Sequence, residues 1–201
     1  SSLRCTLHTL RQQVIKKDTP NYALSDYIAP KGSGRADYIG GFAVGIHGAD
    51  DFAQKFDAAN DPYSSIIVKA LADRLAEAFA EYLHLEARHA WGYEKPGDFS
   101  NEDLVKERYR GIRPAPGYPA CPDHSVKRAM FELLQCQDIG MGLTDSMAMT
   151  PAASVSGFYL AHPQAMYFNV GRIGNDQLRD WAARQAMDVS LAERLLAPAL
   201  G

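Results

Sequence analysis

The sequence predicts an α+β fold in which a small, mainly antiparallel, twisted sheet is flanked by helices. Three observations lead to this prediction. A long helical pattern covers residues 62–91. Two β-type runs, 155–162 and 166–173, are rich in tyrosine, phenylalanine and valine. A third β-type run, 38–46, mixes apolar residues with glycines. Helices and strands that occur in separate stretches, without a strict βαβ repeat, are typical of the α+β class.

The pattern over 62–91 predicts one long central helix. Asp61 is suited to its N-cap, and Pro62 to its first turn, where a missing N–H costs no hydrogen bond. Apolar side chains recur along this segment at helical spacing and form one stripe. The stripe contains Ile67, Leu71, Leu75, Ala78, Phe79 and Tyr82.

The runs 155–162 and 166–173 predict an antiparallel hairpin whose turn is the His-Pro-Gln-Ala sequence at 162–165. Tyr167 and Phe168 would then lie on its second strand. In the run 38–46, the glycines indicate places where another part of the chain approaches closely.

Shorter helices are expected on either side of these elements. Residues 3–17 carry Leu3, Leu7, Leu10 and Val14 on one helical face. A short apolar segment at 24–30 and a turn at 31–34 follow that helix. Ser100 to Asp103 resembles a variant capping box, and Asn175 is suited to cap a helix. The remaining expected helices cover 50–58, 100–109, 123–135, 175–186 and 190–196.

Size and composition suit a single globular domain over 1–201. The chain has 201 residues, 46% of them hydrophobic, and a formal net charge of −3. Such a balanced charge gives no electrostatic basis for binding nucleic acid or an anionic membrane. No apolar run is long enough for a transmembrane helix, and the first residues lack the apolar core of a signal peptide. Three scattered cysteines indicate a reducing, cytoplasmic location rather than a disulfide framework.

A proline-rich loop at 113–122 is the most informative part of the sequence. Its four prolines exclude a helix, because each lacks an N–H and restricts the residue before it. The sequence predicts a stiff, extended loop with one pliable point at Gly117 and one planar cation at its entrance, Arg113. Such a loop could present its backbone groups to a small molecule in a preset pattern. It could also be a purely structural crossover.

Other patterns point away from common chemistries. The glycine clusters at 40–45 and 171–174 lack the GxGxxG spacing of a Rossmann loop, so a bound adenosyl group would be held in another way. The histidine and cysteine spacings do not indicate a metal site. Cys121 could be a nucleophile, with His124 three residues on, although a small buried cysteine is the more common state.

The loop and several other segments resemble the activation domain of cobalamin-dependent methionine synthase, and in particular its S-adenosylmethionine-binding loop. The resemblance covers most of the chain. Its segments are Asp26–Pro30, Ala36–Gly40, Ser65–Phe79, Arg113–His124, Ser154–Phe158, Ala161–Pro163 and Leu196–Pro198.

The resemblance implies a set of S-adenosylmethionine-binding residues. Arg113 would pair with the α-carboxylate, which suits a guanidinium fork. Asp26 would hold the α-ammonium group, although it could instead cap a helix or a turn. Backbone around Gly117 would contact adenine and ribose, and the side chains at 167 and 168 would also contact the ligand. The loop and hairpin positions are Pro116, Gly117, Tyr118, Ala120, Tyr167 and Phe168.

Further roles follow from the same resemblance. Glu77 and Glu107 match acids near the reactive end of the ligand, as secondary contacts, and Tyr118 would also face the cobalamin. As a bare sequence feature, Glu77 reads as a solvated helix residue. No catalytic residue and no metal ligand is implied in this chain, because its part in the reaction is to position the methyl donor.

The implied reaction is the reductive methylation of cob(II)alamin, which reactivates methionine synthase in methionine biosynthesis. A flavodoxin-type protein would donate the electron, and S-adenosylmethionine the methyl group. The family domain begins further upstream than Ser1, and the Asp-x-His-x-x-Gly pattern of a cobalamin module is absent. Cobalamin would therefore be supplied by a separate module. Asp145 and Thr150 stand where the family usually has glutamate and tryptophan.

Two alternatives remain open from the sequence. The chain could be a non-catalytic S-adenosylmethionine-binding or partner-docking module, which would keep the pocket without turnover. It could also be a thiol or metal enzyme that uses Cys121.

Overall fold

A computed structural model describes residues 3–200 and divides the chain into two compact units. Unit 1 contains the chain up to Gly40, Arg110–Ala129, and the chain from Phe158 onward. Unit 2 contains Gly41–Tyr109 and Met130–Gly157. The assignment of 1–201 as one functional domain stays a prediction. The α+β class with small antiparallel pairings and one long helix is confirmed.

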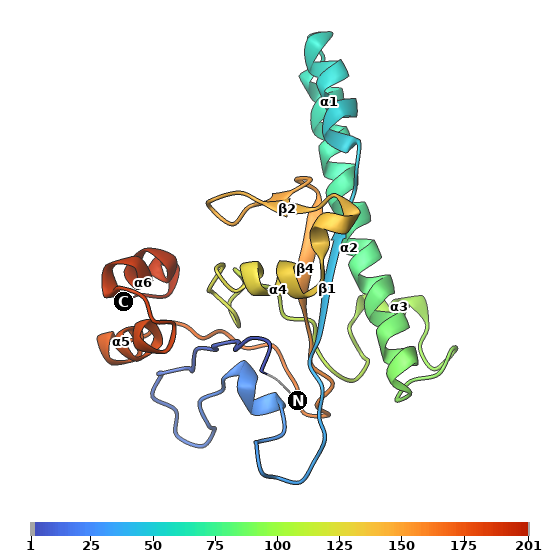
Figure 1. The fold of residues 1–201 in the computed structure, drawn as a ribbon. Helices are drawn as coiled ribbons and strands as arrows, with labels where there is room; N and C mark the ends of the chain where they lie inside the picture. Colours follow the sequence, from blue (N-terminus) through green and yellow to red (C-terminus); the bar gives the residue numbers. More distant parts are fainter. Residues whose placement is uncertain (1–2, 201) are drawn as a thin grey trace. The chain divides into compact units, whose positions relative to one another are not determined.

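Unit 2 is built on the long helix α2 (Pro62–Trp91), whose predicted bounds are correct (Figure 1). The Asp61 side chain accepts a hydrogen bond from the Ser64 N–H at 3.1 Å, Pro62 occupies the first turn, and Gly92 ends the helix in the left-handed conformation. Helix α1 (Ala49–Ala58) packs against α2. Helix α3 (Asn101–Val105) begins with the expected capping box between Ser100 and Asp103.

The strands of unit 2 form two small sheets. Strand β1 (Gly40–Gly45) pairs with β4 (Ser154–Tyr159), and β2 (Gly142–Leu143) pairs antiparallel with β3 (Met149–Thr150). As the glycine pattern predicted, a Cβ on Gly45 would lie 3.0 Å from the Ser154 Oγ. Helix α4 (Lys127–Leu133) and the 3-10 helix η2 (Cys136–Ile139) lead into the second sheet.

A ridge of small residues forms the packed face of α2. Ala72, Ala76 and Ala80 are at most 4% exposed, whereas side chains of the predicted apolar stripe are more than 40% exposed. The stripe members are Ile67 (41%), Leu71 (58%), Leu75 (59%), Phe79 (46%) and Tyr82 (56%). Alanine at the packed positions lets the helix backbone approach its neighbours closely.

Unit 1 has two clusters of buried side chains. In the first, α5 (Asn175–Arg184) and α6 (Val189–Leu195) enclose the fully buried Trp181. The second joins the 3-10 helix η1 (Leu24–Tyr27) to Ile112, Ala120 and Leu160. A short 3-10 helix, η3 (Ala197–Ala199), ends the described part of this unit. Helix α5 begins at the predicted residue, but Gly174 occupies its N-cap and Asn175 does not cap it.

The predicted helix over 3–17 is wrong. This segment is extended, and Arg11 forms an antiparallel bridge with Ala23. Its polar groups find partners far along the chain: the Arg11 N–H donates to Gln177 Oε1, and the Gln12 side chain donates to the Asn169 carbonyl. These tertiary hydrogen bonds replace those of a helix, so that propensity and spacing do not decide the conformation.

The predicted hairpin is also wrong, because only its first strand forms. Strand β4 pairs with β1 in unit 2, and its continuation in unit 1 bonds Ile112 through Leu160. The segment 166–173 is not a strand. Its N–H groups at Val170 and Ile173 donate instead to the carbonyls of Pro119 and Ala199. This arrangement places the segment against the proline-rich loop.

No helix in the described part of the chain is long and apolar enough to cross a membrane.

A buried ion pair near the end of α2 provides a test of what stabilises unit 2. Arg88 Nε donates to Glu94 Oε2 at 2.5 Å, and both side chains are at most 3% exposed. The Arg88 guanidinium also lies 3.6 Å from the centre of the Tyr109 ring. Glu94→Gln would leave the arginine charge buried without its counter-ion. We expect the free energy of unfolding to fall by about 3–5 kcal/mol in urea titrations.

The matched control for this experiment is Glu102→Gln, which removes an exposed partner of Lys106. An exposed pair of this kind contributes about 0.5 kcal/mol or less. Equal effects of the two substitutions would contradict the proposed importance of the buried pair.

Candidate functional site

The segment that leads into the proline-rich loop is held in place by backbone hydrogen bonds within unit 1. The Ile112 and Leu160 backbones exchange two hydrogen bonds of 3.0 Å, and the Phe158 N–H donates to the Pro114 carbonyl at 3.0 Å. Residues 112–114 therefore run antiparallel to 158–160, which explains why residues 166–173 cannot occupy that edge.

The centre of the loop is a tight turn rather than the uniformly extended segment that the prolines suggested. The Gly117 N–H donates to the Cys121 carbonyl at 2.7 Å, and the Cys121 N–H to the Tyr118 carbonyl at 2.8 Å. The Tyr118 N–H donates to the Ala115 carbonyl at 3.2 Å. These bonds fold the chain back at Gly117, which adopts a φ of +94° that favours glycine. The turn is preset by its own hydrogen bonds.

The predicted loop contacts differ in exposure. Gly117 and Tyr118 are exposed at the tip of the turn, whereas Pro116 and Ala120 are buried beneath it. Ala120 belongs to the cluster around η1, and the Val170 N–H donates to the Pro119 carbonyl at 2.9 Å. The tip can therefore meet a ligand while its base is part of the core.

Arg113 and Tyr167, predicted separately from distant segments, are brought together. The Arg113 N–H donates to the Tyr167 hydroxyl oxygen at 3.1 Å. Tyr167 is 45% exposed and Arg113 is partly buried. The Tyr167 hydroxyl is thus fixed to the main chain at the residue that begins the proline-rich loop.

Phe168 has a different place from its neighbour. It is partly buried and packs with Tyr22 and Tyr27, at ring-centre distances of 6.0 and 6.5 Å. The Tyr27 hydroxyl in turn donates to the Met166 carbonyl. This aromatic cluster ties η1 to the segment that carries Tyr167, and the sequence analysis did not anticipate it.

Asp26 occupies the capping role that the sequence left open. Its carboxylate accepts two hydrogen bonds of 2.6 Å from the Arg11 guanidinium and one of 2.9 Å from the Ala23 N–H, which caps η1. The hydrogen bonds from Arg11 lower the pKa of Asp26. A contact with the ammonium group of a ligand stays a prediction for this residue.

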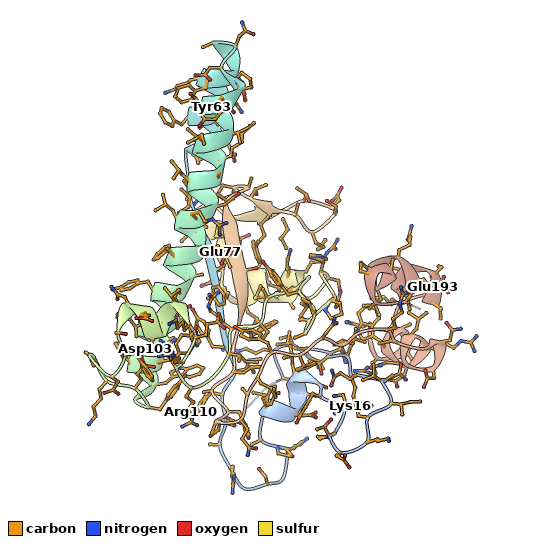
Figure 2. All side chains as sticks on the ribbon, turned by 180° about the vertical axis from the view of Figure 1, so that it is seen from behind. Lys16, Tyr63, Glu77, Asp103, Arg110 and Glu193 are labelled. Atoms are coloured by element: carbon orange, nitrogen blue, oxygen red, sulfur yellow. The ribbon has the colours of Figure 1, made fainter. Side chains whose placement is uncertain are left out.

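The two secondary acids belong to unit 2. Glu77 lies midway along α2 (Figure 2), where it lines a hollow of about 340 Å³ together with Asp73, Arg74 and Val155. Glu107 follows α3 with a φ of +50°, which explains why that helix ends earlier than predicted. Their roles near a ligand stay predictions.

Cys121 does not have the properties of a nucleophile. Burial raises the pKa of its thiol to about 12, and the nearby Asp123 carboxylate adds to this effect. The thiol is therefore protonated at neutral pH, whereas a reactive cysteine needs a lowered pKa. Among residues 3–200, no group of three or more histidine, cysteine, aspartate or glutamate side chains is placed to hold a metal ion.

The sequence analysis placed His124 at the end of the loop, three residues after Cys121, but did not predict its contact with Gly117. An ideal Cβ on Gly117 would lie 2.1 Å from its Cε1 and 2.5 Å from its Nε2, so the ring lies directly against the glycine. Partial burial lowers the pKa of His124, and Lys127 lowers it further, while Asp123 opposes the shift. A contact across seven residues of irregular chain leaves no signal in sequence periodicity.

Gly117→Ala tests how tightly the turn is determined. The substitution forces a side chain into a left-handed backbone and against the His124 ring. Gly32→Ala is the matched control, because Gly32 has a φ of +87° with nothing within 4 Å of an added Cβ. We expect Gly32→Ala to cost about 1–2 kcal/mol of stability. Gly117→Ala should cost about 1–3 kcal/mol more in the same denaturation experiment. Equal losses of stability for Gly32→Ala and Gly117→Ala would mean that the His124 ring moves aside without cost.

Comparisons with known proteins identify the family of this chain. Residues 1–186 match the family model described as vitamin B12 dependent methionine synthase, activation domain. A solved structure titled "Crystal Structure of the MetH Reactivation Domain bound to AdoHcy" is 54% identical, with a TM-score of 0.94 over 96% of this chain. This chain spans 61% of the length of that one. The chain belongs to the activation-domain family of vitamin B12-dependent methionine synthase.

Proposed function

We propose that this chain binds S-adenosylmethionine at the turn of the proline-rich loop and presents its methyl group for the reductive methylation of cob(II)alamin. The observation that carries the proposal is the preset turn around Gly117, with Arg113 and Tyr167 joined at its entrance. The related reactivation domain supports it, because that domain was solved bound to AdoHcy. S-Adenosylhomocysteine is the methyl donor without its methyl group, so both share the carboxylate, ammonium and adenosyl groups.

The residues at the turn fit these groups by charge and shape. The Arg113 guanidinium suits a bidentate pair with the α-carboxylate. The exposed backbone at Gly117 and Tyr118 would face the adenosyl group. Tyr167 would border the same region. Asp26 would have to share its carboxylate with Arg11 to hold the ammonium group, so that its role as a ligand rests on the family resemblance alone.

The chain contributes position rather than acid–base chemistry. Methyl transfer requires the sulfur, the methyl carbon and the acceptor to be aligned at close range, and a rigid turn keeps the donor in one orientation. Reduced cobalamin on a separate module would supply the nucleophile after an electron donor of the flavodoxin type has reduced it. The products would be methylcobalamin and S-adenosylhomocysteine, and this would reactivate a cytoplasmic methyltransferase of methionine biosynthesis.

Calorimetric titration with S-adenosylmethionine tests the ligand and the role of Arg113 together. We expect the wild-type chain to bind and Arg113→Ala to bind at least about 30-fold more weakly, which corresponds to about 2 kcal/mol. Arg113→Lys should fall between the two, because an ammonium group keeps the charge but not the fork. The control is Arg179→Ala, which removes an exposed arginine of α5.

Equal affinities of wild type and Arg113→Ala would contradict the assignment of the carboxylate. A wild-type chain without measurable affinity for S-adenosylmethionine would overturn the proposed function.

Methyl transfer separates this function from a non-catalytic binding module. The chain is mixed with the cobalamin module of a related methionine synthase, a chemical reductant and S-adenosylmethionine labelled in its methyl group. We expect label to pass to cobalamin with one equivalent of S-adenosylhomocysteine formed, and to require the reductant. Binding of S-adenosylmethionine without any transfer of label would favour the non-catalytic alternative.

A further inference from the structure

His124 contacts the turn at the position where the turn has no side chain of its own. Three ring atoms, Cε1, Nε2 and Nδ1, would lie 2.1, 2.5 and 2.8 Å from a Cβ built on Gly117. Such distances mean that the edge of the imidazole covers the Gly117 α-carbon. The ring therefore occupies the space that any other residue at 117 would need.

The backbone hydrogen bonds that close the turn do not involve the side of Gly117 that the His124 ring covers. The turn is closed by the bond from the Gly117 N–H to the Cys121 carbonyl, and its outgoing arm is fixed by the bond from the Val170 N–H to Pro119. Both of these bonds join backbone groups. The His124 ring is the nearest group to a Cβ built on Gly117.

Hydrogen bonds on either side of His124 hold its backbone in place. The Asp123 carboxylate, which is 3% exposed, accepts a hydrogen bond from the Ser125 N–H at 2.7 Å. The His124 carbonyl accepts one from the Lys127 N–H at 3.2 Å, at the start of α4. These two hydrogen bonds therefore fix the backbone position of His124.

We propose that His124 is a positioning residue, whose ring holds the turn around Gly117 in the conformation that binds S-adenosylmethionine. The inference rests on the proposed function, because the turn matters only if it meets the ligand. The ring adds no bond to the ligand. It restricts the motion of Gly117, so that less conformational freedom is lost on binding.

The charge state of the ring is compatible with this role. Partial burial and Lys127 lower the pKa of His124, against the opposing effect of Asp123. A ring that is neutral at neutral pH does not repel a ligand that carries a sulfonium and an ammonium group. The packing of a flat ring, rather than its protonation, is what the turn requires.

The test compares substitutions that keep or remove a flat ring. We expect His124→Ala to weaken the binding of S-adenosylmethionine about tenfold in calorimetry, and His124→Phe to stay within about twofold of wild type. His124→Leu, which fills space without a flat ring, should lie closer to His124→Ala. Melting temperatures are measured for all variants.

His47→Ala is the matched control from unit 2. The His47 ring likewise lies against a left-handed glycine, since its Cε1 is 3.3 Å from a Cβ built on Gly140. It should lose the same kind of contact without changing the affinity for S-adenosylmethionine. If His124→Ala does not fold, the comparison of His124→Phe with His124→Leu carries the test.

Each outcome decides one claim. If Arg113→Ala loses affinity while His124→Ala binds like wild type, the inference about His124 is wrong and the proposed function stands. Equal weakening by His124→Phe and His124→Ala would also overturn it, because a flat ring would then not be sufficient. A wild-type chain that does not bind S-adenosylmethionine would overturn both.

Discussion

Backbone hydrogen bonds from two separate segments hold the proline-rich loop, and the candidate site depends on them. On one side the Phe158 N–H binds the Pro114 carbonyl, and on the other the Val170 N–H binds the Pro119 carbonyl. Prolines cannot donate such bonds, so the loop can be fixed only through its carbonyls and its few N–H groups. Its carbonyls at Pro114 and Pro119 accept from N–H groups of neighbouring segments, while the bonds among 115–121 close the turn itself. This requirement explains why residues 166–173 lie against the loop instead of completing a hairpin.

The same arrangement separates the rigid part of the site from its exposed part. Pro116 and Ala120 are buried at the base, whereas Gly117 and Tyr118 stand exposed at the tip. If the loop were flexible, ordering it on binding would weaken the affinity for a ligand. Here the loop is already ordered in the folded protein, so that entropy cost falls on folding and not on binding. The bond from the Arg113 backbone N–H to the Tyr167 hydroxyl also fixes the main chain that carries the arginine side chain. We expect a site of this kind to bind a ligand with little rearrangement.

How far the sequence predicts this structure depends on the range of the interactions involved. Helix α2 was predicted to the residue because Asp61 and Pro62 act within one turn of chain. The helix over 3–17 failed because Arg11 and Gln12 bond to residues more than 150 positions away. The loop was recognisable from its prolines, which act locally. The contact of His124 with Gly117 and the pairing of Arg11 with Asp26 depend on the folded chain and have no periodic signal.

The chemistry of the loop also limits what it could do with a methyl donor. Its one thiol, Cys121, has a pKa of about 12, so at neutral pH it offers no thiolate to attack a sulfonium methyl group. Asp123, at the end of the loop, is buried beside it and has a raised pKa, chiefly through burial. We expect a methyl donor bound at this turn to meet no thiolate there. The proposed acceptor, a reduced cobalt on another module, is consistent with this inertness.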